Sequence, residues 1–143
     1  MSLDKEYSDI PGTIVFDSQQ SARGYHLNQF CISLRLQKNR DEFAADPEAY
    51  IDRFPMTKEQ RSAALDQEWT LLLELGGNIY YTSKLAACHG INFQELAGLM
   101  TGMGSEKYRA MMLSGGRSIE GNRTKAEWED LSLIHISEPT RPY

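Results

Sequence analysis

Cysteine is scarce in this chain, and long apolar runs are missing. Two cysteines, Cys31 and Cys88, stand among 143 residues, too few and too isolated for a disulfide framework or a thiolate metal cluster. The longest apolar runs, such as residues 71–75, fall far short of the roughly 20 residues that a membrane span requires. We therefore expect both cysteines to pack as small apolar side chains, and we expect no membrane association.

Clusters of basic side chains are missing as well. The chain has fifteen Lys and Arg residues against twenty Asp and Glu residues, with a net charge of -5. Because the basic residues are scattered, nucleic acid is not an expected partner. The acidic start, residues 1–9, lacks the apolar core of a signal peptide, which favours a cytoplasmic protein.

No segment alternates apolar and polar residues between turn-forming residues, as the strands of a hairpin do. Apolar residues recur at helical spacing instead. The length fits one domain, since domains cluster at about 100 to 150 residues. We therefore predict an all-α fold: a compact single domain of about six or seven short helices. An extended N-terminal arm should precede them up to residue 17, because Pro11 disfavours helix and Gly12 permits a turn.

The predicted helix starts carry capping residues. A first helical stretch should run from residue 17 or 18 to about residue 38, and the following starts are predicted from caps at Asp46, Thr57, Asn78, Asn92 and Ser105. Thr57 and Gln60 have the form of a capping box and should open the longest helix, which Gly76 should end.

The end of the chain breaks with the charged segment before it. Residues 131–143, LSLIHISEPTRPY, resemble the translation of a sequencing-library adapter, so we assign the domain to residues 1–130 and interpret 131–143 as a non-native tail. A genuine, variable C-terminus is the alternative.

No constellation typical of catalysis stands out. His26 and His89 could in principle join Glu95 in an iron site, but their spacing gives this no support. Residues 115–121 lack the Gly-Lys-Ser/Thr ending of a phosphate loop, and no nucleophile elbow occurs. We therefore expect no catalytic residue and no metal ligand in this chain.

Four blocks carry a specific resemblance. They are DIPGT at 9–13, GYHLNQFCISL at 24–34, GGNIYYTSKL at 76–85 and the words MTGM and YRAMMLSGGRS within 100–118. In this order and spacing the chain resembles the alpha (small) subunit family of protocatechuate 4,5-dioxygenase, a class II extradiol enzyme. The resemblance implies a large beta subunit that holds Fe(II) through two histidines and a glutamate and binds a catechol-type substrate and O2. This chain would bind no cofactor itself and would cover the pocket.

The resemblance also implies which residues meet the partner. We expect a partner interface at Tyr25, Asn28, Gln29, Asn78, Tyr80, Tyr81 and Arg117, because aromatic rings with polar tips suit surfaces that are partly apolar and partly wet. The alternative is an ordinary helical corner with its tyrosines packed inside. Phe93, after the cap Asn92, is expected in a lid over the substrate pocket, and a core position is its alternative.

Two further functional alternatives stay open on the sequence. The chain could be a standalone helical interaction or regulatory protein that keeps the fold without a dioxygenase partner. It could also be part of a longer chain in which both modules are fused. Protocatechuate or a close relative such as gallate is the expected substrate of the first hypothesis.

Overall fold

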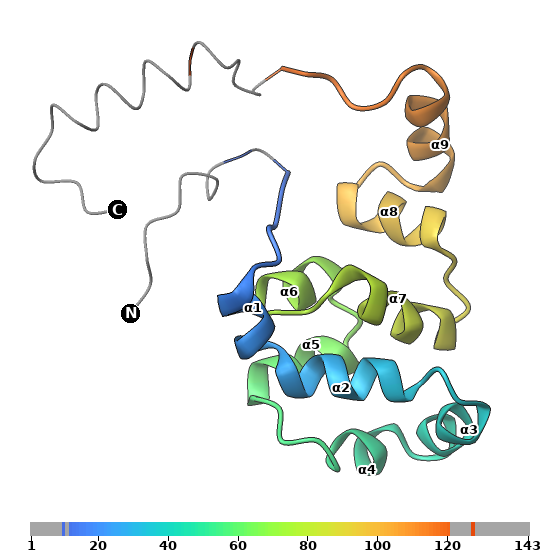
Figure 1. Cartoon of the computed structure of the whole chain (residues 1–143). Helices are drawn as coiled ribbons and strands as arrows, with labels where there is room; N and C mark the ends of the chain where they lie inside the picture. Colours follow the sequence, from blue (N-terminus) through green and yellow to red (C-terminus); the bar gives the residue numbers. More distant parts are fainter. Residues whose placement is uncertain (1–9, 11, 121–126, 128–143) are drawn as a thin grey trace, which may run out of the picture. The chain divides into compact units, whose positions relative to one another are not determined.

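The structure of the chain is a computed structural model, which describes residues 10, 12–120 and 127. Within this part all regular structure is helical, and no strand is found. The helices are α1 Ser18–Arg23, α2 Tyr25–Ser33, α3 Gln37–Ala45, α4 Pro47–Ile51, α5 Lys58–Leu65, α6 Trp69–Glu74, α7 Ile79–Cys88, α8 Phe93–Thr101 and α9 Ser105–Leu113 (Figure 1). The predicted all-α class is confirmed.

The chain divides into two units. Residues 16–116 form one unit, which contains α1 to α9 and is called the helical unit below. The second unit joins residues 1–15 to residues 117–143. In its described part Gly12 has a φ of +65°, and the Thr13 N–H donates to the Ile10 carbonyl at 3.2 Å. The turn predicted at Gly12 is therefore confirmed, whereas residues 131–143 lie outside the described residues.

Capping side chains begin the helices where the sequence predicts them. Asp46, Thr57, Asn78 and Asn92 each accept a hydrogen bond from a backbone N–H of the first turn. Thr57 and Gln60 form a complete capping box, with both hydrogen bonds at 3.1 Å. The cap predicted at Ser105 is wrong, because Gly104 precedes the helix and Ser105 is its first residue, without a capping side chain.

Two predicted helices are each broken in the structure. The stretch expected from residue 17 to residue 38 is interrupted at Gly24 and again after Ser33. The helix expected from Thr57 to Gly76 breaks between α5 and α6, where Gln67 adopts a φ of +57° and the Glu68 N–H donates to the Ala63 carbonyl at 2.9 Å. Such a left-handed residue ends a helix. The described residues therefore hold nine short helices where six or seven were predicted.

One hydrophobic core lies inside the helical unit. Phe30 is fully buried, and its ring contacts the rings of Phe43, Tyr50 and Phe54 at centroid distances of 5.5 to 6.1 Å. Leu, Ile, Ala and Trp side chains from α2, α4, α5, α6, α7 and α8 also belong to the core. Full burial of a Leu or Phe side chain stabilises the folded state by about 1.5–3 kcal/mol. Cys31 is buried among them and Cys88 is half-buried, and both are free thiols.

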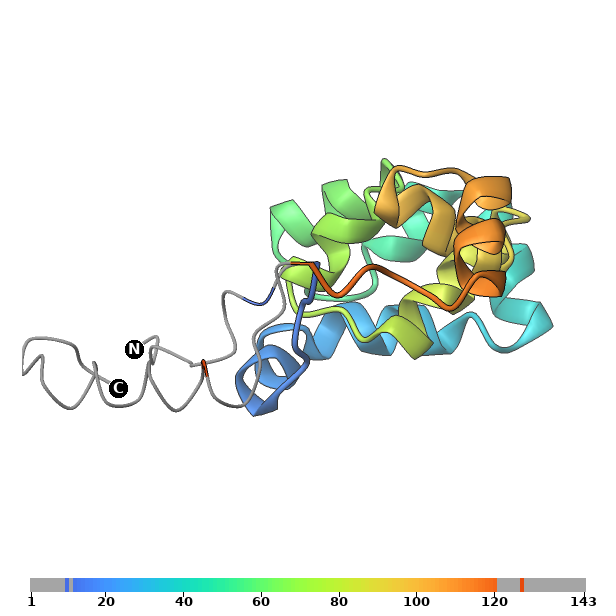
Figure 2. The ribbon, with the colours of Figure 1, turned by 90° about the horizontal axis from the view of Figure 1, so that it is seen from above.

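The packing of the helices sets which of them share a surface. α2 lies beside α7, as Figures 1 and 2 both show, and α6 contacts both α7 and α8. α9 packs mainly against α8 and has no buried residue of its own. Among the described residues, no helix is long and apolar enough to cross a membrane.

Candidate partner-binding surface

Two glycines allow the chain to cross itself at close range. Gly76 ends α6 with a φ of +101°, next to Gly24 at the junction of α1 and α2. A Cβ atom at Gly76 would lie 2.6 Å from the Gly24 nitrogen and 2.8 Å from the Gln20 carbonyl oxygen. Real Cβ atoms do not approach backbone this closely, so glycine is required for packing as well as for its φ.

Side-chain amides satisfy the backbone at this crossing. The Asn28 Nδ2 donates to the Gly76 carbonyl at 3.0 Å, and the Asn28 Oδ1 accepts from the Asn78 N–H at 2.9 Å. The Gln60 Nε2 donates to the carbonyls of Arg23 and Leu75 at 3.0 and 2.9 Å. Unsatisfied backbone groups at such a buried place would each cost about 1–3 kcal/mol.

This network changes the interpretation of Asn28. Its side chain is 6% exposed, and both of its amide atoms bind backbone groups of this chain. Asn28 is therefore part of the crossing, and the interface role predicted for it stays a prediction. The sequence analysis did not predict the role of Gln60 at the crossing. Its capping-box pattern accounts for the Oε1 atom, which accepts from the Thr57 N–H, but not for the hydrogen bonds from Nε2 to the distant carbonyls.

Exposed tyrosine side chains lie at the starts of α2 and α7, the helices that follow Gly24 and Gly76. Tyr25 is the first residue of α2 and is 56% exposed, while Tyr80, in the first turn of α7, is 73% exposed. Tyr81 is 37% exposed, and Gln29 is also exposed. The alternative that these tyrosines pack inside is therefore wrong for Tyr25 and Tyr80. We call Tyr25, Gln29, Tyr80 and Tyr81 the tyrosine surface.

The predicted cap and lid residues lie at the start of α8. The Asn92 Oδ1 accepts from the Glu95 N–H at 2.8 Å, which fixes the first turn. Phe93 is the first residue of the helix, and 58% of its side chain is exposed. The alternative that Phe93 belongs to the core is therefore wrong. Ile91, on the other side of the cap, packs partly against the core instead.

Asn78 and Arg117, the remaining predicted interface residues, both make contacts within the chain. Asn78 is half-buried and uses its Oδ1 to cap α7 by accepting from the Tyr80 N–H at 2.9 Å. Arg117 belongs to the second unit, where its guanidinium lies against Gly12. The interface role of both residues stays a prediction.

The titratable side chains give no metal-binding set in the described residues. No group of three His, Cys, Asp or Glu side chains that could hold a metal ion occurs there. His89 lies beside the rings of Phe43 and Trp69, and partial desolvation lowers its pKa. Burial raises the pKa of the Cys31 thiol and of the Cys88 thiol, so both thiols stay protonated near neutral pH.

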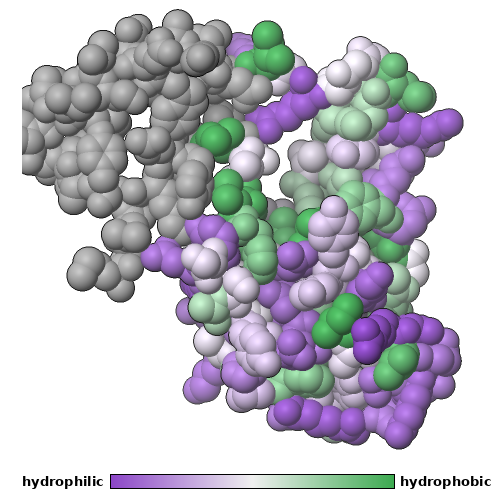
Figure 3. Space-filling view, in the orientation of Figure 1, coloured by the Kyte–Doolittle hydropathy of each residue, from purple (hydrophilic) through white to green (hydrophobic). Residues whose placement is uncertain are grey.

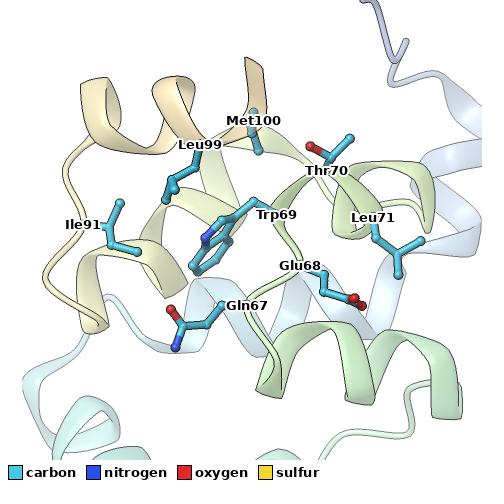
Figure 4. Close-up of a pocket in the computed structure, with 8 residues that line it drawn as sticks. All are labelled: Gln67, Glu68, Trp69, Thr70, Leu71, Ile91, Leu99 and Met100. Atoms are coloured by element: carbon cyan, nitrogen blue, oxygen red, sulfur yellow. The ribbon is translucent and has the colours of Figure 1, made fainter. Parts of the chain in front are cut away.

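A hollow of about 420 Å³ opens between α6 and α8. Trp69 lies at its centre, with Ile91 and Leu99 on one side (Figure 4). The full lining consists of Gln67, Glu68, Trp69, Thr70, Leu71, Ile91, Leu99 and Met100. The sequence did not predict this hollow, because residues 66–68 had been assigned to the interior of one long helix.

Comparison with known proteins gives two findings. Residues 27–113 match the family described as aromatic-ring-opening dioxygenase LigAB, LigA subunit. The chain is also similar to gallate dioxygenase of Pseudomonas putida, with 25% identity over 99 residues. This similarity covers 69% of the chain but 29% of the relative, so the chain spans less than a third of that protein's length.

Proposed function

Because the chain belongs to the LigA-subunit family of the aromatic-ring-opening dioxygenase LigAB, we propose that it is the noncatalytic small subunit of such an enzyme. The enzyme opens the ring of protocatechuate or a related catechol such as gallate with O2, in the cytoplasm. The observation that carries this proposal is the family match over residues 27–113, which runs from α2 to the last residue of α9. Similarity to gallate dioxygenase supports the substrate class.

The proposal divides the work between two chains. A large catalytic subunit holds Fe(II), which supplies the activation of O2 and of the catechol. This chain contributes a rigid cover, and its described residues take no part in metal ligation. In gallate dioxygenase the matched region is 29% of the protein, so there it is part of a longer chain.

The tyrosine surface is the proposed contact with the catalytic subunit. Tyrosine and tryptophan are enriched where partners meet, because they bury a large area and lose little conformational entropy. Tyr25 and Tyr80 are both more than half exposed and start helices that are held together by the Gly24 and Gly76 crossing. The backbone that carries them is therefore held in place before binding, which lowers the entropic cost of association.

Phe93 is the proposed contact with the substrate pocket. Its backbone is fixed by the Asn92 cap, while its ring is free to meet another surface. An aromatic ring that closes over a pocket excludes water and restricts how the substrate lies. In this proposal Phe93 positions the catechol ring and contributes to the choice between substrates.

Co-expression with the catalytic chain of a LigAB-type dioxygenase tests the proposed function. Oxygen uptake is measured on protocatechuate and gallate for the catalytic chain alone and for the co-purified complex. We expect a stable complex with higher kcat/KM on at least one catechol. A catalytic chain that neither retains this chain nor changes its oxygen uptake would contradict the proposal and favour a standalone helical interaction protein.

A further inference from the structure

The indole of Trp69 is a buried hydrogen-bond donor without a partner in the described part of the chain. Trp69 is 6% exposed, and its ring contacts the ring of His89 at a centroid distance of 6.2 Å. No hydrogen bond joins the Trp69 Nε1–H to any residue that the structure describes. A buried indole N–H usually has an acceptor, and each exception needs an explanation. An acceptor supplied by a bound molecule would satisfy this donor.

This donor lies at the hollow between α6 and α8. Trp69 is one of the residues that line the hollow, and Figure 4 shows its nitrogen on the edge of the indole that faces Ile91. On the face of the helical unit shown in Figure 3, apolar and polar side chains are mixed over α8 and α9. Apolar exposure alone therefore does not single out the hollow, whereas an unpartnered donor at its centre does.

The walls of the hollow fit the apolar body of a small molecule. Ile91 and Met100 pack partly against the core, and Leu99 lines the hollow with them and is 56% exposed. Small-molecule sites are mostly apolar, with a few polar groups that orient the ligand, and have volumes of about 300–1,000 Å³. The volume of this hollow, about 420 Å³, lies near the lower end of that range. The expected ligand is therefore small.

The charge at the hollow disfavours anionic ligands. Glu68 lines the hollow, and its carboxylate has no ion pair or hydrogen bond with any described residue. Among the described residues that line the hollow, none is Lys or Arg. A carboxylate bound beside Glu68 would meet a like charge that no basic neighbour offsets, which raises its free energy. An uncharged ligand therefore fits the hollow better than an anion.

The backbone at the hollow is held in an uncommon conformation. Gln67 lines the hollow with a φ of +57°, the one positive φ of a non-glycine residue in the described part of the chain. Such conformations cost free energy and cluster at ligand-binding and active sites. The Gln67 amide has no hydrogen-bond partner among the described residues, so its donors and its acceptor can bind a polar group of a ligand.

We infer that the hollow at Trp69 binds a small, uncharged molecule with an apolar body and an oxygen acceptor. The acceptor, a carbonyl, ether or hydroxyl oxygen, binds the Trp69 N–H, and the apolar body lies against Ile91, Leu99 and Met100. The inference does not rest on the proposed function, since neither Phe93 nor the tyrosine surface lines the hollow. Protocatechuate and gallate carry a carboxylate, so the hollow selects against both and takes a different ligand.

Nuclear magnetic resonance of the full chain tests this site, with cyclohexanone as the probe. The chain has two tryptophans, and Trp69→Phe identifies the indole N–H resonance of Trp69 by its loss. Cyclohexanone should move this resonance until it saturates, because the indole N–H donates to the ketone oxygen. The other indole resonance is the internal control. Movement of neither resonance, or equal movement of both, overturns the site.

Variants of the lining test which groups hold the probe. The Kd for cyclohexanone is measured on the methyl resonance of Met100, and melting temperatures verify that each variant is folded. Trp69→Phe should raise the Kd about three- to tenfold, the usual loss of one hydrogen bond. Leu99→Ala should raise it too, whereas Leu36→Ala, which shortens a leucine of similar exposure, 53% against 56%, should not. An unchanged Kd in Trp69→Phe and in Leu99→Ala overturns the site.

Cyclohexanecarboxylate tests the role of the charge. The unchanged chain should bind it at least about tenfold more weakly than cyclohexanone. Glu68→Gln should strengthen binding of the carboxylate and leave that of the ketone unchanged, whereas Glu59→Gln, at an exposed acid on α5, should alter neither. Equal affinity of the unchanged chain for both probes overturns the assignment of an uncharged ligand.

The catalytic chain of a LigAB-type dioxygenase is added in a separate titration, because a protein segment is the other possible occupant. The small-molecule site predicts that the Trp69 indole resonance responds to cyclohexanone in the free chain. A resonance that responds to the catalytic chain and not to cyclohexanone assigns the hollow to a protein partner and overturns the inference.

Discussion

Substitution of Gly76 by alanine tests the crossing that positions the tyrosine surface. The new Cβ would lie 2.6 Å from the Gly24 nitrogen and 2.8 Å from the Gln20 carbonyl oxygen, and both are backbone atoms that cannot turn away. The φ of +101° adds backbone strain for any residue with a side chain. Strain contributes about 1–3 kcal/mol and overpacking about 1–3 kcal/mol, so we expect the free energy of unfolding to fall by about 2–6 kcal/mol.

Gly90 provides the matched control for this substitution. Its φ of +74° is also left-handed, but nothing lies within 4 Å of an added Cβ. Gly90→Ala should therefore cost only the backbone term, about 1–2 kcal/mol. Urea unfolding of both variants gives the two free energies, provided that the slope m is unchanged. Equal destabilisation by Gly76→Ala and Gly90→Ala would refute the close approach as the reason for glycine at the crossing.

Three further predictions concern single side chains. Asn28→Ala should lower the free energy of unfolding by about 2–4 kcal/mol, because it leaves two backbone groups unsatisfied. Tyr80→Ala should change it by less than about 0.5 kcal/mol. Urea unfolding measures both values, and equal losses would contradict the assignment of Asn28 to the crossing and of Tyr80 to the surface. Phe93→Ala should leave the melting temperature nearly unchanged, because the ring is mostly exposed, and should alter the ratio of kcat/KM for protocatechuate and gallate; a destabilised chain with an unaltered ratio contradicts the lid. The lowered pKa of His89 means that the unfolded state binds more protons than the folded state. The free energy of unfolding should therefore rise with pH across the interval from the lowered to the ordinary pKa, and this gain should be lost as pH falls through the interval. Unfolding at several pH values should show this slope, and a slope that persists in His89→Gln would belong to another group.

The helix starts could be predicted from the sequence because their signals are local. Thr57, Asn78 and Asn92 cap their helices through bonds to residues two or three positions ahead, and such bonds depend on neighbouring residues alone.

The breaks inside the predicted helices could not be derived in this way. Gln67 ends α5 with a positive φ, although glycine or asparagine usually marks such a place. Gly24 interrupts the first helical stretch where the distant Gly76 passes close to it. Contacts of this kind join residues about 50 positions apart, as the bond from Asn28 to Gly76 does, and periodicity within a segment carries no information on them.

Titration of the catalytic chain with this chain tests the central claim most directly. Oxygen uptake on protocatechuate and on gallate is followed while this chain is added to a fixed amount of the catalytic chain of a LigAB-type dioxygenase. If this chain is the small subunit, kcat/KM should rise and then saturate at a fixed ratio of the two chains. Oxygen uptake that stays constant over the whole titration, with the two chains migrating separately, would contradict the claim.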